Sequence, residues 1–312
     1  MHRPRHAPAS LVRFTAAALL LVGSPASADA PDPWPLRLRA QMVQLARVEW
    51  RLRRAAAPLC PRTSAGFGLA LDHIAAYGAG DRAMVASLLA MADAPQVYAV
   101  EPESPADRAG VRAGDEILAI DGVATADLLA RSPDKSLFSD ELAARMAAHT
   151  AGQPLLLRLR RAGTELALKL TPETICNAPF VLRTSSAVDA YSDGARLAVT
   201  SGLIAFTRDE DELALIAGHE LAHVVNGDGK AKGLAERRRM EDDADVLGAA
   251  IARCAGYDVP LALGFWQRYR KGDLLGFLRA PTHGSSSARA AHIAGTAAAP
   301  CPLDPSATPG LR

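Results

Sequence analysis

The chain has 312 residues, a hydrophobic content of 49% and a net charge of +1, from 35 Lys and Arg against 34 Asp and Glu. Residues 1–28 carry three Arg and no acid. The remaining chain therefore has 32 basic and 34 acidic residues, a net charge of −2. This balance argues against nucleic acid or an anionic membrane as the main partner. The length that remains is enough for two domains.

The first 28 residues have the pattern of an export signal. Basic residues come first, residues 14–22 are apolar, and Ala26, Ser27 and Ala28 form an A-x-A cleavage site. The apolar run is too short to span a bilayer. We therefore expect cleavage near Ala28, a periplasmic or secreted protein and no stable membrane insertion. The alternative is an uncleaved signal that tethers the chain to a membrane.

Residues 34–57 have the apolar spacing of an amphipathic helix with many Arg. The apolar positions are Leu38, Met42, Leu45, Val48 and Leu52. The apolar face is narrow and Glu49 interrupts the basic one, which favours packing on a protein core over binding to a membrane. We predict that the segment 29–61 is a helix packed on the domain that residues 173–300 form.

Four cysteines follow the signal, at Cys60, Cys176, Cys254 and Cys301. An even count in an exported chain predicts two disulfides, for which three pairings are possible. We favour Cys60–Cys176 and Cys254–Cys301, because the first pair brackets a segment that has the character of an inserted domain. A zinc site built from these cysteines is not expected, since no C-x-x-C spacing occurs.

Residues 62–172 contain the segment S-P-A-D-R-A-G-V-R-A-G-D-E-I-L-A-I-D-G at 104–122. It strongly resembles a PDZ domain, in which a short helix leads through a Gly-Asp turn to a strand that ends in a second turn. The resemblance implies a groove helix over 139–149 and a closing hairpin around Ala162 and Gly163.

The same resemblance implies a peptide-binding loop, made of Gly66, Phe67, Gly68 and Leu69. Backbone N–H groups of this loop would bind a peptide carboxylate, while the peptide adds a strand to the sheet edge. The alternative is a turn without a binding role, because Gly-rich segments are common turns. An additional helical stretch over 81–91 could reshape or cover the groove.

The most specific motif is H-E-x-x-H at His219, Glu220 and His223, inside the helix-patterned run 212–225. Residues four apart share one face of a helix, so both imidazoles can bind one zinc ion. Glu220, next to the first ligand, is placed to take a proton from a water on the metal. This arrangement hydrolyses peptide bonds.

A catalytic zinc site needs a third protein ligand. Residues 230–254 have the pattern of a second helix, in which Glu241 and Asp245 face the same way and Asp242 and Asp243 are turned away. We predict that Glu241 is the third ligand and that Asp245 accepts the N–H of a ligand His and fixes its tautomer. The alternative is an acidic, solvated helix face.

H-E-x-x-H followed by E-x-x-A-D on the next helix resembles the gluzincin metallopeptidases of the HtpX and CAAX prenyl protease type, over residues 174–295. The strand and turn at 199–204 also match. The segment 187–191 resembles the family's edge strand, with Asp189 in place of its Asn. Thr282 and His283, with Arg289 six residues on, resemble the family's Thr-His-Pro segment and its Arg, with Gly284 in place of the Pro. The resemblance implies that His283 stabilises the oxyanion and that Arg289 supports the site.

Together these features predict an α+β chain with a zincin-like (gluzincin) catalytic domain over 173–300, a PDZ-like β-rich insert over 62–172 and a loose tail over 301–312. We expect an exported endopeptidase with one Zn²⁺ per chain. Its partners would be unfolded or misassembled envelope polypeptides, bound in part through their C-terminal segments, and not nucleic acid. The alternatives are a PDZ-led adaptor or chaperone with an inactive zinc core and a signal-anchored processing protease.

Overall fold

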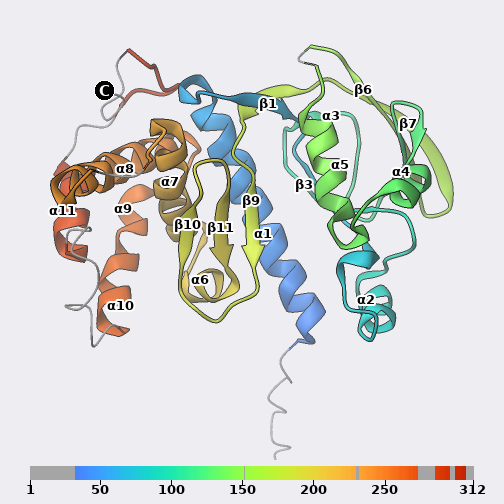
Figure 1. Ribbon diagram of the computed structural model, residues 1–312, viewed down its shortest axis with the longest axis horizontal. Helices are drawn as coiled ribbons and strands as arrows, with labels where there is room; N and C mark the ends of the chain where they lie inside the picture. The colour runs from blue at the N-terminus through green and yellow to red at the C-terminus, as the bar shows by residue number, and fades with distance from the viewer. Residues whose placement is uncertain (1–31, 151, 230–231, 273–284, 296–298, 307–312) are drawn as a thin grey trace, which may run out of the picture. The chain divides into compact units, whose positions relative to one another are not determined.

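The computed structural model describes residues 32–150, 152–229, 232–272, 285–295 and 299–306. This part of the chain is mixed α and β, as predicted (Figure 1). The predicted export signal lies outside the described residues. Within them, no helix has the length and apolarity that a membrane crossing requires.

The described chain begins with the predicted amphipathic helix, α1 (Trp34–Ala56), which is followed by a short 3-10 turn (Ala57–Leu59). Its apolar positions Val48 and Leu52 are fully buried. The helix contacts both the PDZ-like segment and the part of the chain from residue 177 on, here called the H-E-x-x-H segment. Arg39 forms an ion pair with Asp72 of the PDZ-like segment at 2.6 Å, and the Gln41 amide donates to a backbone carbonyl of the H-E-x-x-H segment at 3.1 Å.

The PDZ-like segment forms a sheet in the order β2-β3-β4-β6-β7, with β5 paired to β4. Its strands are β2 (Leu69–Asp72), β3 (Gln96–Val100), β4 (Glu116–Ile120), β5 (Val123–Ala124), β6 (Leu155–Arg161) and β7 (Thr164–Leu170). Its helices are α2 (Arg82–Leu89), α3 (Pro105–Arg108), α4 (Thr125–Arg131) and α5 (Phe138–Ala147), with 3-10 turns η2 (Ile74–Ala76) and η3 (Lys135–Leu137). The apolar face of α5, with Phe138 and Leu142, is buried in the core of this segment.

Two predicted local features of this segment are confirmed. The β6–β7 hairpin turns at Ala162 and Gly163, both of which have positive φ. The extra helical stretch is α2, which ends at Ala90 in the left-handed conformation.

The two ends of the PDZ-like segment are joined by a two-stranded antiparallel sheet of β1 (Thr63–Gly66) and β8 (Glu173–Cys176). Thr63 pairs with Cys176, and the favoured disulfide Cys60–Cys176 is present with a Cα–Cα distance of 5.4 Å. The disulfide and the strand pair therefore fix the ends of the segment beside each other, which is the geometry expected of an inserted domain.

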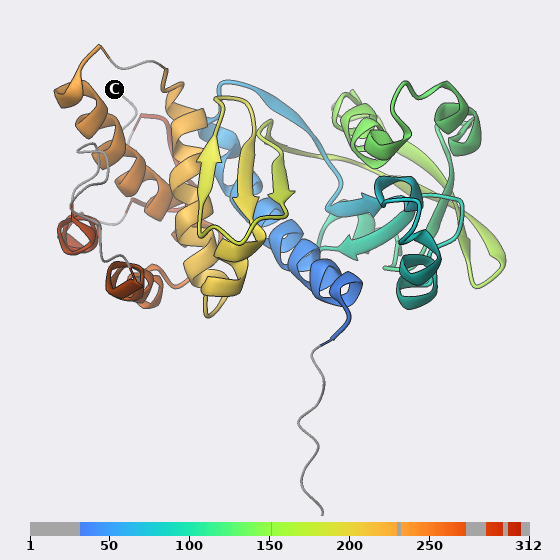
Figure 2. The ribbon, with the colours of Figure 1, turned by 60° about the horizontal axis from the view of Figure 1, so that its bottom comes forward.

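Within the described residues, the H-E-x-x-H segment combines a small sheet with six helices. The strands are β9 (Phe180–Arg183), β10 (Ala190–Ser192) and β11 (Leu197–Thr200), in the order β10-β11-β9. The helices are α6 (Ser201–Phe206), α7 (Glu210–Asn226), α8 (Leu234–Cys254), α9 (Val259–Ala262), α10 (Gly264–Gly272) and α11 (Ser286–Gly295). Helix α7 packs against α8 on one side, and β10 lies beside it on another (Figures 1 and 2).

The second favoured disulfide, Cys254–Cys301, is also present, with a Cα–Cα distance of 5.5 Å. The described residues that follow it, 302–306, differ from the loose tail that the Pro- and Ala-rich sequence predicts. The Leu303 side chain is only 3% exposed, because it packs into the core of the H-E-x-x-H segment. Residues 301–303 are thus anchored at two neighbouring points.

Candidate metal centre

The helix α7 carries H-E-x-x-H, and two side-chain hydrogen bonds fix its first turn. The Asp209 carboxylate accepts the Glu212 N–H at 3.0 Å, and the Glu212 carboxylate accepts the Arg208 N–H at 2.9 Å. Asp209 is thus the N-cap of the helix. Gly227, in the left-handed conformation at φ 68°, ends the helix.

Helices α7 and α8 cross at a pair of glycines. A Cβ added to Gly248 would lie 2.5 Å from the backbone nitrogen of His219, and a Cβ added to Gly218 would lie 2.8 Å from the carbonyl oxygen of Gly248. These distances are too short for any side chain, so the two backbones touch. The contact places the next turns of α8, with Glu241 and Asp245, directly beside the two histidines.

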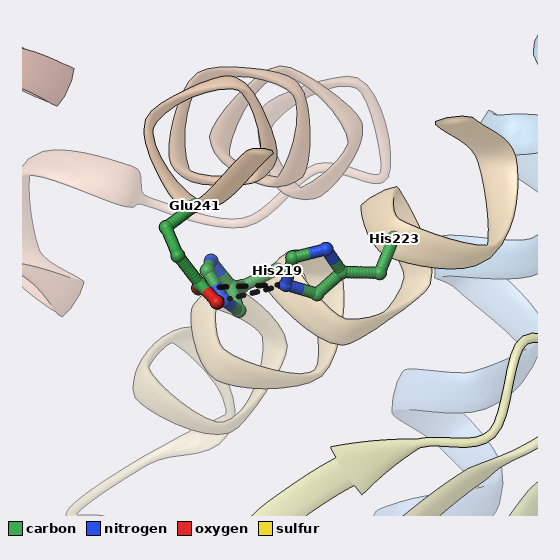
Figure 3. A group of neighbouring side chains, drawn as sticks. All are labelled: His219, His223 and Glu241. Carbon is green, nitrogen blue, oxygen red and sulfur yellow. Dashed lines mark hydrogen bonds and ion pairs between the residues drawn. The ribbon is translucent and has the colours of Figure 1, made fainter. Parts of the chain in front are cut away.

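Figure 3 shows the imidazoles of His219 and His223 and the carboxylate of Glu241 pointing toward one another. The two Nε2 atoms are 3.2 Å apart. Oε2 of Glu241 lies 3.3 Å from Nε2 of His219 and 3.6 Å from Nε2 of His223. Atoms that bind a tetrahedral zinc ion at about 2.0–2.1 Å lie about 3.3–3.4 Å from one another. The three donor atoms therefore fit zinc in spacing as well as in chemical type.

Behind His219 lies a buried ionic network. Asp245 accepts from His219 Nδ1 at 2.9 Å, and the Arg289 guanidinium donates to both oxygens of Asp245, at 2.5 and 2.8 Å. The guanidinium also stacks on the Trp266 ring, 4.0 Å from its centroid. Burial raises the pKa of the Asp245 carboxyl, but Arg289 and His219 outweigh burial and hold it at about 2. Asp245 is therefore an anion that orients His219.

His223 has a carboxylate partner that the sequence analysis missed. Its Nδ1 atom lies 2.7 Å from Oδ2 of Asp228, just after the end of α7. Burial lowers the pKa of the His223 imidazole, but hydrogen bonds with Glu241 and Asp228 outweigh it and raise the pKa to about 9. In the absence of metal the imidazole is charged at neutral pH, so metal binding at this site must displace a proton.

Glu220 lies on the same helix and faces the small sheet. Burial raises the pKa of its carboxyl above the ordinary value, while the two neighbouring imidazoles and a hydrogen bond with Ser192 of β10 oppose that shift. A half-buried carboxyl beside two metal-ligand candidates can exchange protons with a water held there. Glu220 is thus in place for general-base chemistry.

The other predicted site residues fall in several places. Asp242 is exposed and Asp243 half-buried, both turned from the three donor atoms as their register predicted. Arg289 is brought to the site through Asp245, whereas the predicted oxyanion residue His283 lies outside the described residues.

The predicted peptide-binding loop lies at the junction of β1 and β2. Phe67 is buried, and Gly68 has φ 68° with no room for a side chain, because a Cβ would lie 2.2 Å from that of Ser104. The Gly68 carbonyl accepts the backbone N–H of Glu101 at 2.8 Å. Gly66 and Leu69 are the flanking strand ends. The loop is thus a bend of two residues, Phe67 and Gly68, that connects β1 to the edge strand β2.

Replacing Gly248 with Ala should weaken both the fold and the metal centre. The added methyl meets the backbone of His219, which cannot rotate aside, so the helices must separate at a cost of about 1–3 kcal/mol. Thermal unfolding and zinc titration of the purified variant measure the two effects. Gly233→Ala, at the other end of α8, is the control, since its Cβ meets no atom within 4 Å. Wild-type stability and zinc binding in Gly248→Ala would contradict the close contact.

Two family models match parts of the chain. Residues 157–234 match the model of peptidase family M48, and residues 96–135 match that of the PDZ domain. The first match includes the H-E-x-x-H helix and supports a metallopeptidase. It ends before Glu241, so the third donor rests on the geometry above. No curated protein matches the chain.

Among solved structures, the chain is similar to the HtrA3 PDZ domain bound to a phage-derived ligand, FGRWV, with 23% identity and a TM-score of 0.27 over 36% of this chain and 89% of that one. It is similar to the HtrA-type protease AlgW with a decapeptide, with 20% identity and a TM-score of 0.27 over 36% and 30% of the two chains. A serine endoprotease from Yersinia pestis follows, with 25% identity and a TM-score of 0.21 over 26% and 25%. The chain thus spans less than a third of either protease.

Proposed function

We propose that the chain is an exported, zinc-dependent endopeptidase of the gluzincin kind, similar to HtpX and the CAAX prenyl proteases, that cleaves unfolded or misassembled envelope proteins. The observation that carries the proposal is the convergence of His219, His223 and Glu241 on one point, with Glu220 beside it. These residues supply three protein donors and one base, the set that a catalytic zinc site requires.

Zinc bound to these donors would supply a Lewis acid that polarises the peptide carbonyl and makes water a nucleophile near neutral pH. Glu220 would take the proton from the attacking water and return it to the leaving amine. Asp245 and Arg289 would hold the His219 ring in orientation. His283 remains our candidate for stabilising the oxyanion, on the resemblance alone.

The strand β10 offers a place for an extended substrate. Within the described sheet it pairs only with β11, so its other edge has backbone groups available for a further strand. Strand β10 contacts helix α7, and its Ser192 lowers the pKa of Glu220, which supports an edge close to the proposed base. A polypeptide added along β10 would therefore pass close to the metal centre.

The PDZ-like segment would present substrate. Its β2 strand is also the last of its sheet in the described chain, and the Gly66–Leu69 loop precedes it. In this proposal the loop N–H groups bind the carboxylate of a C-terminal segment while the peptide pairs with β2.

Cleavage of the export signal near Ala28 would make Asp29 the N-terminus, which N-terminal sequencing of the purified protein tests.

Casein digestion with and without a zinc chelator tests the activity. We expect the protein to degrade casein, to lose all measurable cleavage when the chelator removes zinc, and to recover it when zinc is restored. A zinc-loaded protein that binds unfolded casein without cleaving it would contradict the peptidase proposal. It would favour the adaptor alternative, in which the PDZ-like segment acts without catalysis.

A further inference from the structure

Asp228 occupies the first position after the glycine that ends α7. Gly227 takes the left-handed conformation and reverses the chain, and the Asp228 N–H then donates to the His223 carbonyl at 3.0 Å. The same turn brings Oδ2 of Asp228 to 2.7 Å from Nδ1 of His223. Backbone and side chain of Asp228 thus both contact one residue, and that residue is a candidate metal ligand.

The contact repeats, for the second histidine, what Asp245 does for the first. His219 has a carboxylate 2.9 Å from Nδ1, His223 has one 2.7 Å from Nδ1, and in both rings Nε2 is left to face Glu241. A carboxylate at Nδ1 can only accept, so it holds the proton on that nitrogen and leaves the Nε2 lone pair for a metal. The two carboxylates reach the rings from different elements, Asp245 from α8 and Asp228 from the turn after α7.

We propose that Asp228 is a positioning residue of the metal centre, which holds the His223 imidazole in the rotamer and tautomer that turn Nε2 toward Glu241. The proposal rests on the zinc site proposed above. The Asp228 carboxylate is not needed to end the helix, because Gly227 and the Asp228 backbone N–H already do so. The side chain contributes specifically to the histidine.

The exposed fraction of both side chains supports a stable contact. Each is 16% exposed, so water competes little for the hydrogen bond and the ring has few alternative orientations. The partner comes from the adjoining turn and not from a distant part of the chain. The geometry is therefore set once α7 and its last turn are formed, which reduces the entropy that metal binding must overcome.

The test is the zinc dissociation constant, measured by competition with a chelator, for wild type, Asp228→Ala and Asp228→Asn. Loss of an outer-shell partner of a ligand His typically weakens metal binding by about 10–100-fold, and we expect this for Asp228→Ala. Asp228→Asn keeps an oxygen acceptor but no charge, so we expect a smaller loss, of at least about threefold. The visible spectrum of the cobalt-loaded variants should shift, since the His223 ring is no longer fixed.

Asp243→Ala is the matched control. Burial and then the charge of Asp228 raise the pKa of Asp243, so the two acids lie close enough to interact. The control therefore removes a nearby acid without removing the hydrogen bond between Asp228 and His223. We expect its zinc affinity to stay within about twofold of wild type. An equal loss in the control would show that general charge and not the contact is at work, and would overturn the proposal.

An unchanged zinc affinity in Asp228→Ala also overturns it, whatever the variant's activity. Circular dichroism of the zinc-free variants checks folding. If the alanine variant does not fold, Asp228→Asn decides the question on the same criterion, with an unchanged affinity again contrary to the proposal. A wild-type protein that binds zinc and cleaves nothing would contradict the peptidase function but not the role of Asp228, which the affinities alone decide.

Discussion

Replacing Glu220 with Gln is expected to lower peptide hydrolysis by about 10²–10⁴-fold while zinc binding stays intact. Gln has the size of Glu but cannot take a proton at neutral pH, and Glu220 is not among the three converging donors. The change thus removes the base and leaves the ligands in place. Turnover of a fluorogenic peptide and metal analysis of the same sample measure the two quantities.

Glu165→Gln is a suitable control for that variant, because it makes the same chemical change at an exposed position on the PDZ-like sheet. It should hydrolyse peptide at the wild-type rate. If Glu220→Gln keeps more than about a tenth of wild-type turnover, Glu220 is not the general base. If it loses zinc together with activity, Glu220 acts on the metal and not on the water.

Replacing Glu241 with Ala is expected to remove zinc and activity together. With two of three protein donors left, zinc affinity should fall by more than the roughly 10–100-fold that loss of an outer-shell partner costs. Asp242→Ala is the matched control. It removes an acid one position along α8, exposed and turned about 100° from Glu241.

Metal analysis of the two purified variants decides between the possible ligands. Zinc-depleted Glu241→Ala beside zinc-loaded Asp242→Ala is the expected pair of results. If the Asp242 variant loses zinc and the Glu241 variant keeps it, Asp242 and not Glu241 is the third ligand. Normal zinc content in both would mean that the two histidines bind the metal with a partner outside the described residues.

The parts of the site that the sequence predicted are those that depend on helix geometry. Residues four apart share a face, so His219 with His223, and Glu241 with Asp245, were expected to point the same way, and they do. Periodicity within one helix was enough for these predictions.

The remaining parts depend on contacts that no local rule describes. The approach of Gly218 to Gly248 requires knowing which faces of two helices meet. Asp228 lies in a turn, where side chains follow no periodicity, so its direction toward His223 could not be deduced. An acid directly after the glycine that ends an H-E-x-x-H helix is the signal that could have found it.

The three converging donors belong to one helical hairpin, α7 with α8, and this affects the order in which the protein can fold. The entropy of closing a loop grows with its length, and neighbouring helices pair quickly. The three donors need only that hairpin, whereas the disulfide Cys60–Cys176 must close a separation of 116 residues. Zinc that binds the hairpin stabilises it. The metal site can therefore form as an early folding nucleus, before the ends of the PDZ-like segment meet.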